Sequence, residues 1–475
     1  MGSSLFRTKS IERILADSDA PEHRLKKTLT AWDLTGLGIG AIIGTGIFVL
    51  IGTAIVGDAH RPGAGPGIIL SFMLSGLTCA FAALCYAEFA AMIPVAGSAY
   101  TYSYATLGEL LAWLTGWNLI LEYGVACVAV AIGWSGYFNN ILKLCGIELP
   151  YWATHAPGTE GGIANLPAAI IVLLVTIILV IGVKESARAT GVIVLIKLAV
   201  ITFFIAVGAG AVDKANWSPF MPFGFDGVGA AAAIVFFAYI GFDAVSTTAE
   251  EARNPQRDLP IGIFASLFIC TLLYIAVAAI LTGLIPYSKI DIHAPVAEAL
   301  SVVGYRWGAA VVAVGAVAGI TSVLVVMMIG QIRVFFAMSR DGLLGPWLSA
   351  VHPKFRTPHH ATYLTGVAVA VLAAFIPIGD AADMTNIGTL FAFVLVCIGV
   401  MVLRYTKPLQ PRPFRMPLMP WVPLLGMFAC LALMAFLPTL TWIRFVVWTI
   451  IGIAVYFMYG IRHSRLSTPS RDTPA

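Results

Sequence analysis

The chain has 475 residues, of which 59% are hydrophobic and only 11% are charged. An ordinary soluble domain is about 45–50% apolar and about 25% charged, so this composition excludes a soluble globular protein. The formal net charge of +4 follows from uneven loop charges and does not indicate a nucleic-acid-binding surface. The composition predicts an all-α polytopic membrane protein.

Twelve windows along the chain are long and apolar enough to cross about 30 Å of hydrocarbon. They cover residues 32–57, 66–92, 107–143, 163–183, 191–212, 227–249, 260–285, 303–340, 360–378, 382–404, 420–437 and 441–461. We therefore predict twelve transmembrane helices, of which the third and eighth are long enough to tilt or to leave the bilayer.

Lysine and arginine are distributed unevenly between the two sets of loops. An even number of helices puts both termini on one side, and that side carries 21 of these residues against six on the other. Cytoplasmic loops are the ones enriched in Lys and Arg. We expect a multi-pass protein of the plasma (inner) membrane with cytoplasmic N- and C-termini.

The first 30 residues are charged and lack the apolar core of a cleavable signal peptide. Their apolar residues fit either a short interfacial helix or a disordered tail. These residues are Leu5, Phe6, Ile11, Ile14 and Leu15. The seven cysteines lack metal-type spacing and fit core positions, so we expect no metal site, no disulfide framework and no cofactor.

Two of the windows contain segments that disfavour a continuous helix. Residues 36–46 hold five glycines in eleven positions, and residues 236–243 place Gly241 inside an apolar run. Glycine costs roughly 1 kcal/mol per residue in a helix interior. No strand precedes the first segment, so a dinucleotide-binding loop is excluded. Tight helix packing through Gly40 and Gly44 is the structural alternative, but it does not explain a second break.

The two broken segments occupy spans one and six, the first members of two five-helix units. In transporters built from inverted repeats, paired broken helices place the substrate at the membrane midplane. An α-amino acid presents one carboxylate and one ammonium. We predict that N–H groups around Gly44, Thr45 and Gly46 bind the carboxylate and that backbone carbonyls bind the ammonium. These carbonyls belong to Ile42, Phe237, Ala238 and Ile240, and Ile43 is a further expected residue of the site.

Several long stretches resemble the amino acid–polyamine–organocation superfamily, within it the cationic amino acid transporter branch, as a bacterial homologue. The similar stretches cover residues 38–52, 86–102, 108–123, 236–263 and 337–344. The resemblance implies a leucine-transporter-type fold with two inverted five-helix repeats and amino acid uptake by alternating access. It also implies that the Gly44-Thr45-Gly46 segment takes the carboxylate, that the Ile240-Gly241 break contributes carbonyls, and that Phe237 is an aromatic gate on the external side.

The resemblance divides the chain into five parts. These are a cytoplasmic tail at 1–30, the first repeat at 31–215, the second repeat at 216–405, helices eleven and twelve at 406–461, and a second cytoplasmic tail at 462–475.

Two acidic residues fall inside predicted spans, where ionisable groups are costly and usually functional. Glu122 lies about 22 Å along the third span, too deep to reach water easily. It fits contact with a cationic side chain, uptake of a proton, or a structural hydrogen bond. Many eukaryotic relatives carry a small residue there, so their substrate preference does not transfer simply. Asp243 follows the second break and fits either the substrate site or the cap of a half-helix.

Lys197 lies about 9 Å from the cytoplasmic start of the fifth span by helical rise. It fits either a snorkelling lysine or a buried ammonium between spans one and eight, where sodium-coupled members of this fold hold a sodium ion. Thr321 and Ser322 in the eighth span line either that place or the substrate cavity. The second interpretation favours proton coupling through Lys197, and the proton-coupled branch of the superfamily is similar in carrying such a lysine.

The sequence thus predicts a secondary active transporter that imports L-amino acids, with protons as the coupling ion. Expected substrates are cationic amino acids such as arginine and lysine, small neutral ones such as alanine, or both. An exchanger or an uncoupled facilitator is the alternative, and a channel or receptor is a more distant one. We expect no enzyme, because no nucleophile, base and metal constellation is present. Expected partners are the amino acid, protons and membrane lipid; nothing in the sequence points to an accessory subunit.

Overall fold

The computed structural model describes residues 7–12, 14–15, 27–95, 98–158, 161–182 and 187–465, without the side chains of 187–190. Its regular structure within these ranges is helical, apart from two isolated β-bridges. An all-helical protein is expected, because only helices satisfy every backbone hydrogen bond within one segment in lipid.

Each of the twelve predicted windows corresponds to a helix or to a broken series of helices. The first five are α3 (Ala31–Ile42) with η1 (Gly46–Leu50) and α4 (Ile51–Val56), α5 (Ile68–Met92), α7 (Glu109–Leu144), α8 (Leu166–Ile181) and α9 (Ala187–Ala209). The next five are α10 (Gly224–Val235) with η5 (Phe236–Tyr239) and α11 (Ala244–Thr247), α12 (Pro255–Leu284), α14 (Arg306–Arg340), α15 (His359–Phe375) and α16 (Ile378–Thr406). The last two are α17 (Trp421–Ala435) and α18 (Thr439–Val455).

The described residues form eight helices that are long and apolar enough to cross a membrane, or nine if the bent pair 31–42 and 46–56 is one span. Three shorter apolar helices, α8, α15 and α17, have 10–17 residues each. The protein is therefore a multi-pass helical membrane protein.

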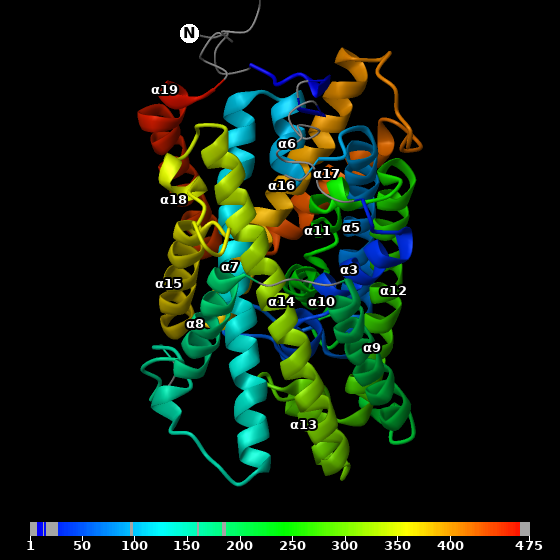
Figure 1. Cartoon of the computed structure of the whole chain (residues 1–475). Coiled ribbons are helices and arrows are strands. Elements are labelled where there is room, and N and C mark those ends of the chain that lie inside the picture. Colours follow the sequence, from blue (N-terminus) through cyan, green and yellow to red (C-terminus); the bar gives the residue numbers. More distant parts are fainter. Residues whose placement is uncertain are drawn as a thin grey trace, which may run out of the picture.

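The long helix α7 runs through the middle of the bundle beside α14 and α16, while α12 packs against α3 and α5 (Figure 1). Several of these contacts depend on glycine. A Cβ at Gly262 of α12 would lie 2.8 Å from Leu34 Cβ of α3, and a Cβ at Gly315 of α14 would collide with Val200 of α9. Small residues allow helix backbones to approach closely in lipid, where burial of apolar surface gives little driving force.

The two ends of the described chain meet at one end of the bundle. The Lys9 amide donates to Tyr104 O of α6 (Ser98–Thr106), and the Arg465 amide donates to Asp341 O after α14. Figure 1 shows α6 and α19 (Ile461–His463) at this end and α13 (Pro295–Val302) at the opposite end. Both ends of the described chain therefore lie at the same end of the bundle.

Part of the N-terminal tail lies among the described residues. Ile11 and Ile14 lie in a helical stretch and are 2% and 3% exposed. Ile11 and Ile14 are therefore helical, as one of the two alternatives for this segment predicted. Leu5 and Phe6 lie outside the described residues. All seven cysteines are unpaired, and six of them are buried.

Candidate functional site

The first break lies between α3 and η1. Thr30 caps α3 through a reciprocal pair of hydrogen bonds with Asp33, and the helix ends at Ile42. Ile43 is extended, with φ −74° and ψ 104°, and regular structure resumes at Gly46 after a bend of 43°. A break is thus present within the predicted glycine-rich segment 36–46, between Ile42 and Gly46.

The second break lies between η5 and α11. Ile240 is extended, with ψ 132°, and Gly241 has φ +118°. Only glycine adopts this conformation readily, and a Cβ here would lie 2.9 Å from the carbonyl carbon of Ala41 in α3. The glycine therefore allows both the turn and the close approach of the two broken helices.

The two breaks touch each other. Gly46 lies directly against the backbone of Ala238, leaving no room for a side chain at Gly46. Residues almost two hundred positions apart thus bring their irregular backbones together in the core of the bundle. This is the juxtaposition that the glycine pattern predicted.

The freed carbonyls of the first break are bound by a lysine ammonium. Lys197 Nζ of α9 donates to Gly40 O at 2.5 Å and to Ile43 O at 3.0 Å, and its side chain is 0% exposed. On its other side the lysine stem lies against Gly319 of α14, where a Cβ would be 3.1 Å from Lys197 Cγ. The lysine is therefore buried between α3 and α14 and does not snorkel to water.

Two tyrosines bind further carbonyls near the breaks. Tyr274 Oη of α12 lies 3.0 Å from Ile42 O and 2.9 Å from Ala238 O, and Tyr137 of α7 donates to Phe48 O at 2.7 Å. The sequence analysis missed both residues. A phenol within an apolar span signals a need for an acceptor, because a buried hydroxyl usually finds one.

The remaining predicted residues line the breaks from several helices. Thr45 is 1% exposed, and its Oγ1 has no hydrogen-bond partner among the described residues. Val323 of α14 faces Gly44, and Ser322 beside it donates to Gly319 O at 2.8 Å. Phe237 is 6% exposed and belongs to η5. Most of this surface is backbone and apolar side chain.

The two predicted carboxylates lie together at the second break, where Asp243 directly precedes α11. Tyr123 donates to Asp243 Oδ2 at 3.2 Å, Asp243 interacts electrostatically with Glu122, and both carboxylates are 1% exposed. Glu122 Oε1 has no hydrogen-bond partner within the described part of the chain. Two buried, poorly satisfied carboxylates in one apolar core are typical of functional groups.

The level of Glu122 along α7 differs from that of Thr45 in the first break. Gly133 of α7 lies against Thr45, where a Cβ would be 2.5 Å from Thr45 Cγ2. Glu122 precedes Gly133 by eleven residues, which corresponds to about 16 Å along the helix. Side chains also tilt toward the N-terminus of a helix, and this tilt takes the Glu122 carboxylate further from Thr45.

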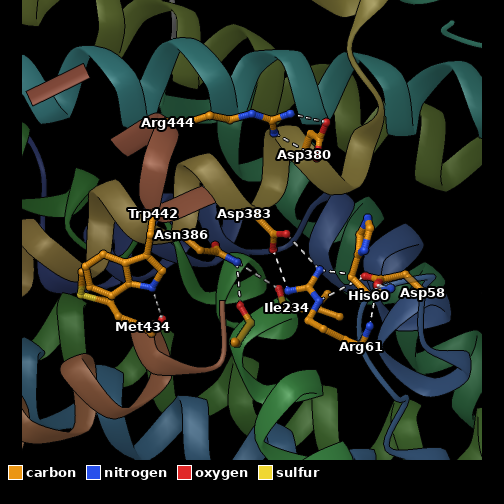
Figure 2. A network of polar contacts seen from close by, with 11 residues as sticks. Asp58, His60, Arg61, Ile234, Asp380, Asp383, Asn386, Met434, Trp442 and Arg444 are labelled. Carbon is orange, nitrogen blue, oxygen red and sulfur yellow. Dashed lines mark hydrogen bonds and ion pairs between the residues drawn. The ribbon is translucent and has the colours of Figure 1, made fainter. Parts of the chain in front are cut away.

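A buried ion pair lies at the other end of the bundle, shown in Figure 2. Arg61, in the loop after α4, binds Asp383 of α16 through two hydrogen bonds of 2.9 and 3.0 Å. Asp58 accepts from the same guanidinium at 2.8 Å. Nearby, Asn386 donates to Ala233 O of α10 at 2.7 Å. The sequence analysis did not identify this network, because Arg61 and Asp383 are 322 residues apart.

Comparison with known proteins agrees with this arrangement. The family model described as amino acid permease matches residues 29–459. The chain belongs to the amino acid permease family. This permease is 51% identical over 466 residues to the methylthioribose transporter of Bacillus subtilis (strain 168), covering 98% of this chain and 100% of that protein.

Two further relatives of this permease carry amino acids in their names. The branched-chain amino acid permease BcaP of Bacillus subtilis (strain 168) is 50% identical, with 98% of this chain and 100% of that protein covered. The vacuolar cationic amino acid transporter 4 of Arabidopsis thaliana is 38% identical, with 86% and 68% covered. The predicted superfamily is therefore confirmed, and these relatives point to transport rather than catalysis.

Proposed function

We propose that this permease is a secondary transporter that imports a neutral L-amino acid by alternating access. The observation that carries the proposal is the contact between the two breaks, which brings backbone groups of α3, η1 and η5 to one point in the bundle core. The N-terminal end of η1 at Gly44, Thr45 and Gly46 suits a carboxylate. Carbonyls of Ile42 and Ala238 suit an ammonium.

Both groups are the constant part of an α-amino acid, so they do not choose a side chain. The other lining residues proposed for the site are Ile43, Phe237, Ile240 and Ser322, with Phe237 as the external gate. These residues are apolar or small and carry no charge, which favours a neutral substrate side chain.

A cationic substrate fits this geometry less well. An arginine or lysine side chain reaches roughly 7 Å from its Cα by ordinary bond lengths. Glu122 lies about 16 Å along α7 from the level of Thr45, so the side chain of a substrate whose carboxylate is bound at Thr45 would not reach it. We therefore favour alanine, leucine and their like over arginine, and we assign the Glu122 and Asp243 pair to proton uptake on the inner side.

We propose proton coupling through Lys197. Its ammonium binds Gly40 O of α3 and Ile43 O of the first break, while its stem packs against Gly319 of α14, so the side chain bridges the two helices. Loss of its proton would weaken both hydrogen bonds and loosen α3, the inner half of the broken span. Exchange of one amino acid for another is the alternative, because it needs the same site but no ion gradient.

The topology proposed is twelve crossings, made by the eight long helices, the bent pair and the three shorter apolar helices. In this proposal residues 31–215 and 216–405 form two inverted repeats of a leucine-transporter-type fold. Helices 406–461 lie beside them, and the tails 1–30 and 462–475 face the cytoplasm of a cell whose plasma membrane holds the protein.

Binding of unlabelled compounds to the purified protein tests the substrate class. L-leucine and L-alanine are expected to raise the melting temperature, whereas L-arginine and methylthioribose at equal concentration are not. Stabilisation by methylthioribose alone would contradict the proposal, since this sugar has neither carboxylate nor ammonium. Stabilisation by L-arginine alone would return the assignment to cationic substrates.

A further inference from the structure

Tyr274 lies where the two broken helices meet. Its side chain is 0% exposed, and its hydroxyl oxygen is within 3.0 Å of Ile42 O and 2.9 Å of Ala238 O. One of these carbonyls ends α3 and the other belongs to η5. A single phenol on α12 therefore links the two breaks.

The three oxygens at this point share one hydrogen. A tyrosine hydroxyl has a single O–H donor, so it satisfies only one of the two carbonyls at a time. A buried acceptor without a donor is unfavourable. A primary ammonium carries three N–H donors and no acceptor. It could therefore donate one hydrogen bond to each of the two carbonyl oxygens and one to the phenol oxygen.

The ring of Tyr274 is held rigidly by other aromatic rings. Its centroid lies 5.4 Å from that of Phe72 on α5 and 5.5 Å from that of Tyr239 in η5. The hydroxyl of Tyr239 donates to Phe72 O at 2.8 Å. The position of the Tyr274 hydroxyl is thus set by packing and does not depend on a ligand.

We propose that Tyr274 is the positioning residue of the amino-group subsite. Its hydroxyl holds Ile42 O and Ala238 O at one spacing and contributes the third oxygen that a primary ammonium contacts. The inference rests on the proposed function, and it deepens it by naming a residue that makes the site select an amino group over a hydroxyl group.

The test compares L-leucine with (S)-2-hydroxy-4-methylpentanoate, which keeps the carboxylate and the side chain but replaces the ammonium by a hydroxyl. Both compete with radiolabelled L-leucine for uptake into proteoliposomes, and the ratio of their inhibition constants measures amino-group selectivity. The variant is Tyr274→Phe, which keeps the ring. Tyr239→Phe is the matched control, because it removes a hydroxyl from the neighbouring ring whose acceptor lies within α5.

We expect the wild type to prefer L-leucine by about 100-fold or more, since a site built around hydrogen bonds rejects an analogue that cannot make them. In Tyr274→Phe the ratio is expected to fall by about tenfold, through a higher KM for L-leucine at similar kcat. Tyr239→Phe is expected to keep the wild-type ratio.

An unchanged ratio in Tyr274→Phe, an equal loss in Tyr239→Phe, or a wild type that does not distinguish the two compounds would overturn the inference alone. A wild type that takes up no amino acid would overturn the proposed function and the inference with it. If Tyr274→Phe does not elute as a folded protein, Tyr274→His replaces it as the test variant. The His variant is also expected to lower the ratio, because its shorter side chain cannot reach both carbonyls, and an unchanged ratio there overturns the inference equally.

Discussion

Individual glycines at the breaks differ sharply in what surrounds them. Gly46 lies against the backbone of Ala238, and Gly241 combines a positive φ with contact to Ala41. Gly36, in the same glycine-rich run, has nothing within 4 Å of the place a Cβ would take. The sequence shows five similar glycines in residues 36–46, and only the packing tells which of them the site requires.

Substitution of these glycines by alanine is therefore expected to have unequal effects. Gly46→Ala and Gly241→Ala should each reduce amino acid uptake at least about tenfold, because backbone rather than a flexible side chain must move. Gly36→Ala should leave uptake within about twofold, since its Cβ meets open space and alanine favours helix. Uptake normalised to the amount of folded protein is the measurement, and equal losses at Gly36 and Gly46 would contradict the account.

The Lys197 ammonium makes a second residue-scale prediction. Lys197→Met keeps the length of the side chain but removes both hydrogen bonds to α3 and the titratable group. We expect proton-driven accumulation of L-leucine to be lost, whereas Lys143→Met at the outer end of α7 should behave as the wild type. Normal accumulation in Lys197→Met, measured at equal protein content, would remove the lysine from the coupling mechanism.

At the scale of elements, the broken helices could be predicted but their supports could not. Glycine cost and hydropathy locate a break within a few residues, and the bounds at Ile42 and Gly46 agree with that expectation. The partners of the freed carbonyls come from α9 and α12, in windows that are otherwise uniformly apolar. Lys197 could be identified from the sequence because it is the charged residue in its window. Tyr274 carries no charge and was therefore not identified.

The buried ion pair of Arg61 and Asp383 joins α16 to the loop after α4. Arg61 and Asp383 are 8% and 4% exposed, so removing Arg61 leaves the Asp383 carboxylate buried without its partner, whereas removing Asp383 leaves the guanidinium paired with Asp58 alone. Breaking such a pair costs about 3–5 kcal/mol, whereas removing both partners costs less. We expect Arg61→Leu and Asp383→Leu each to lower the melting temperature of the purified protein, and the double variant to recover part of the loss.

A matched control exists on the neighbouring surface. Arg444 and Asp380 also form an ion pair, at 3.0 Å, but their side chains are 36% and 41% exposed. Exposed pairs contribute about 0–1 kcal/mol, so Asp380→Leu should change the melting temperature little. If Asp380→Leu and Asp383→Leu lowered the melting temperature equally, burial would not be the reason why the Arg61–Asp383 pair contributes to stability.

For the molecule as a whole, the proposed topology of twelve crossings with cytoplasmic termini would place residues 144–165 outside the cell. Cys145 in this segment is the exposed cysteine, and the other six are buried. A membrane-impermeant maleimide added to intact cells is therefore expected to label the protein, and Cys145→Ser should abolish the labelling. Labelling only after the cells are permeabilised would reverse the proposed orientation.

Most of the architecture followed from composition and hydropathy, because lipid imposes helices and sets their length. The twelve windows match helices in the structure, and the family was evident from long ordered motifs. The distance of Glu122 from the breaks was not accessible, because it depends on which residue of α7 meets Thr45. In the proposed function, that register favours neutral over cationic substrates.

Accumulation of radiolabelled L-leucine in proteoliposomes, with an inward proton gradient and no sodium, tests the central claim most directly. The account predicts internal L-leucine above the external concentration, collapse of this excess when the gradient is dissipated, and no excess with Gly46→Ala. Uptake that only equilibrates and ignores the gradient, or the absence of any L-leucine uptake by folded protein, would contradict it.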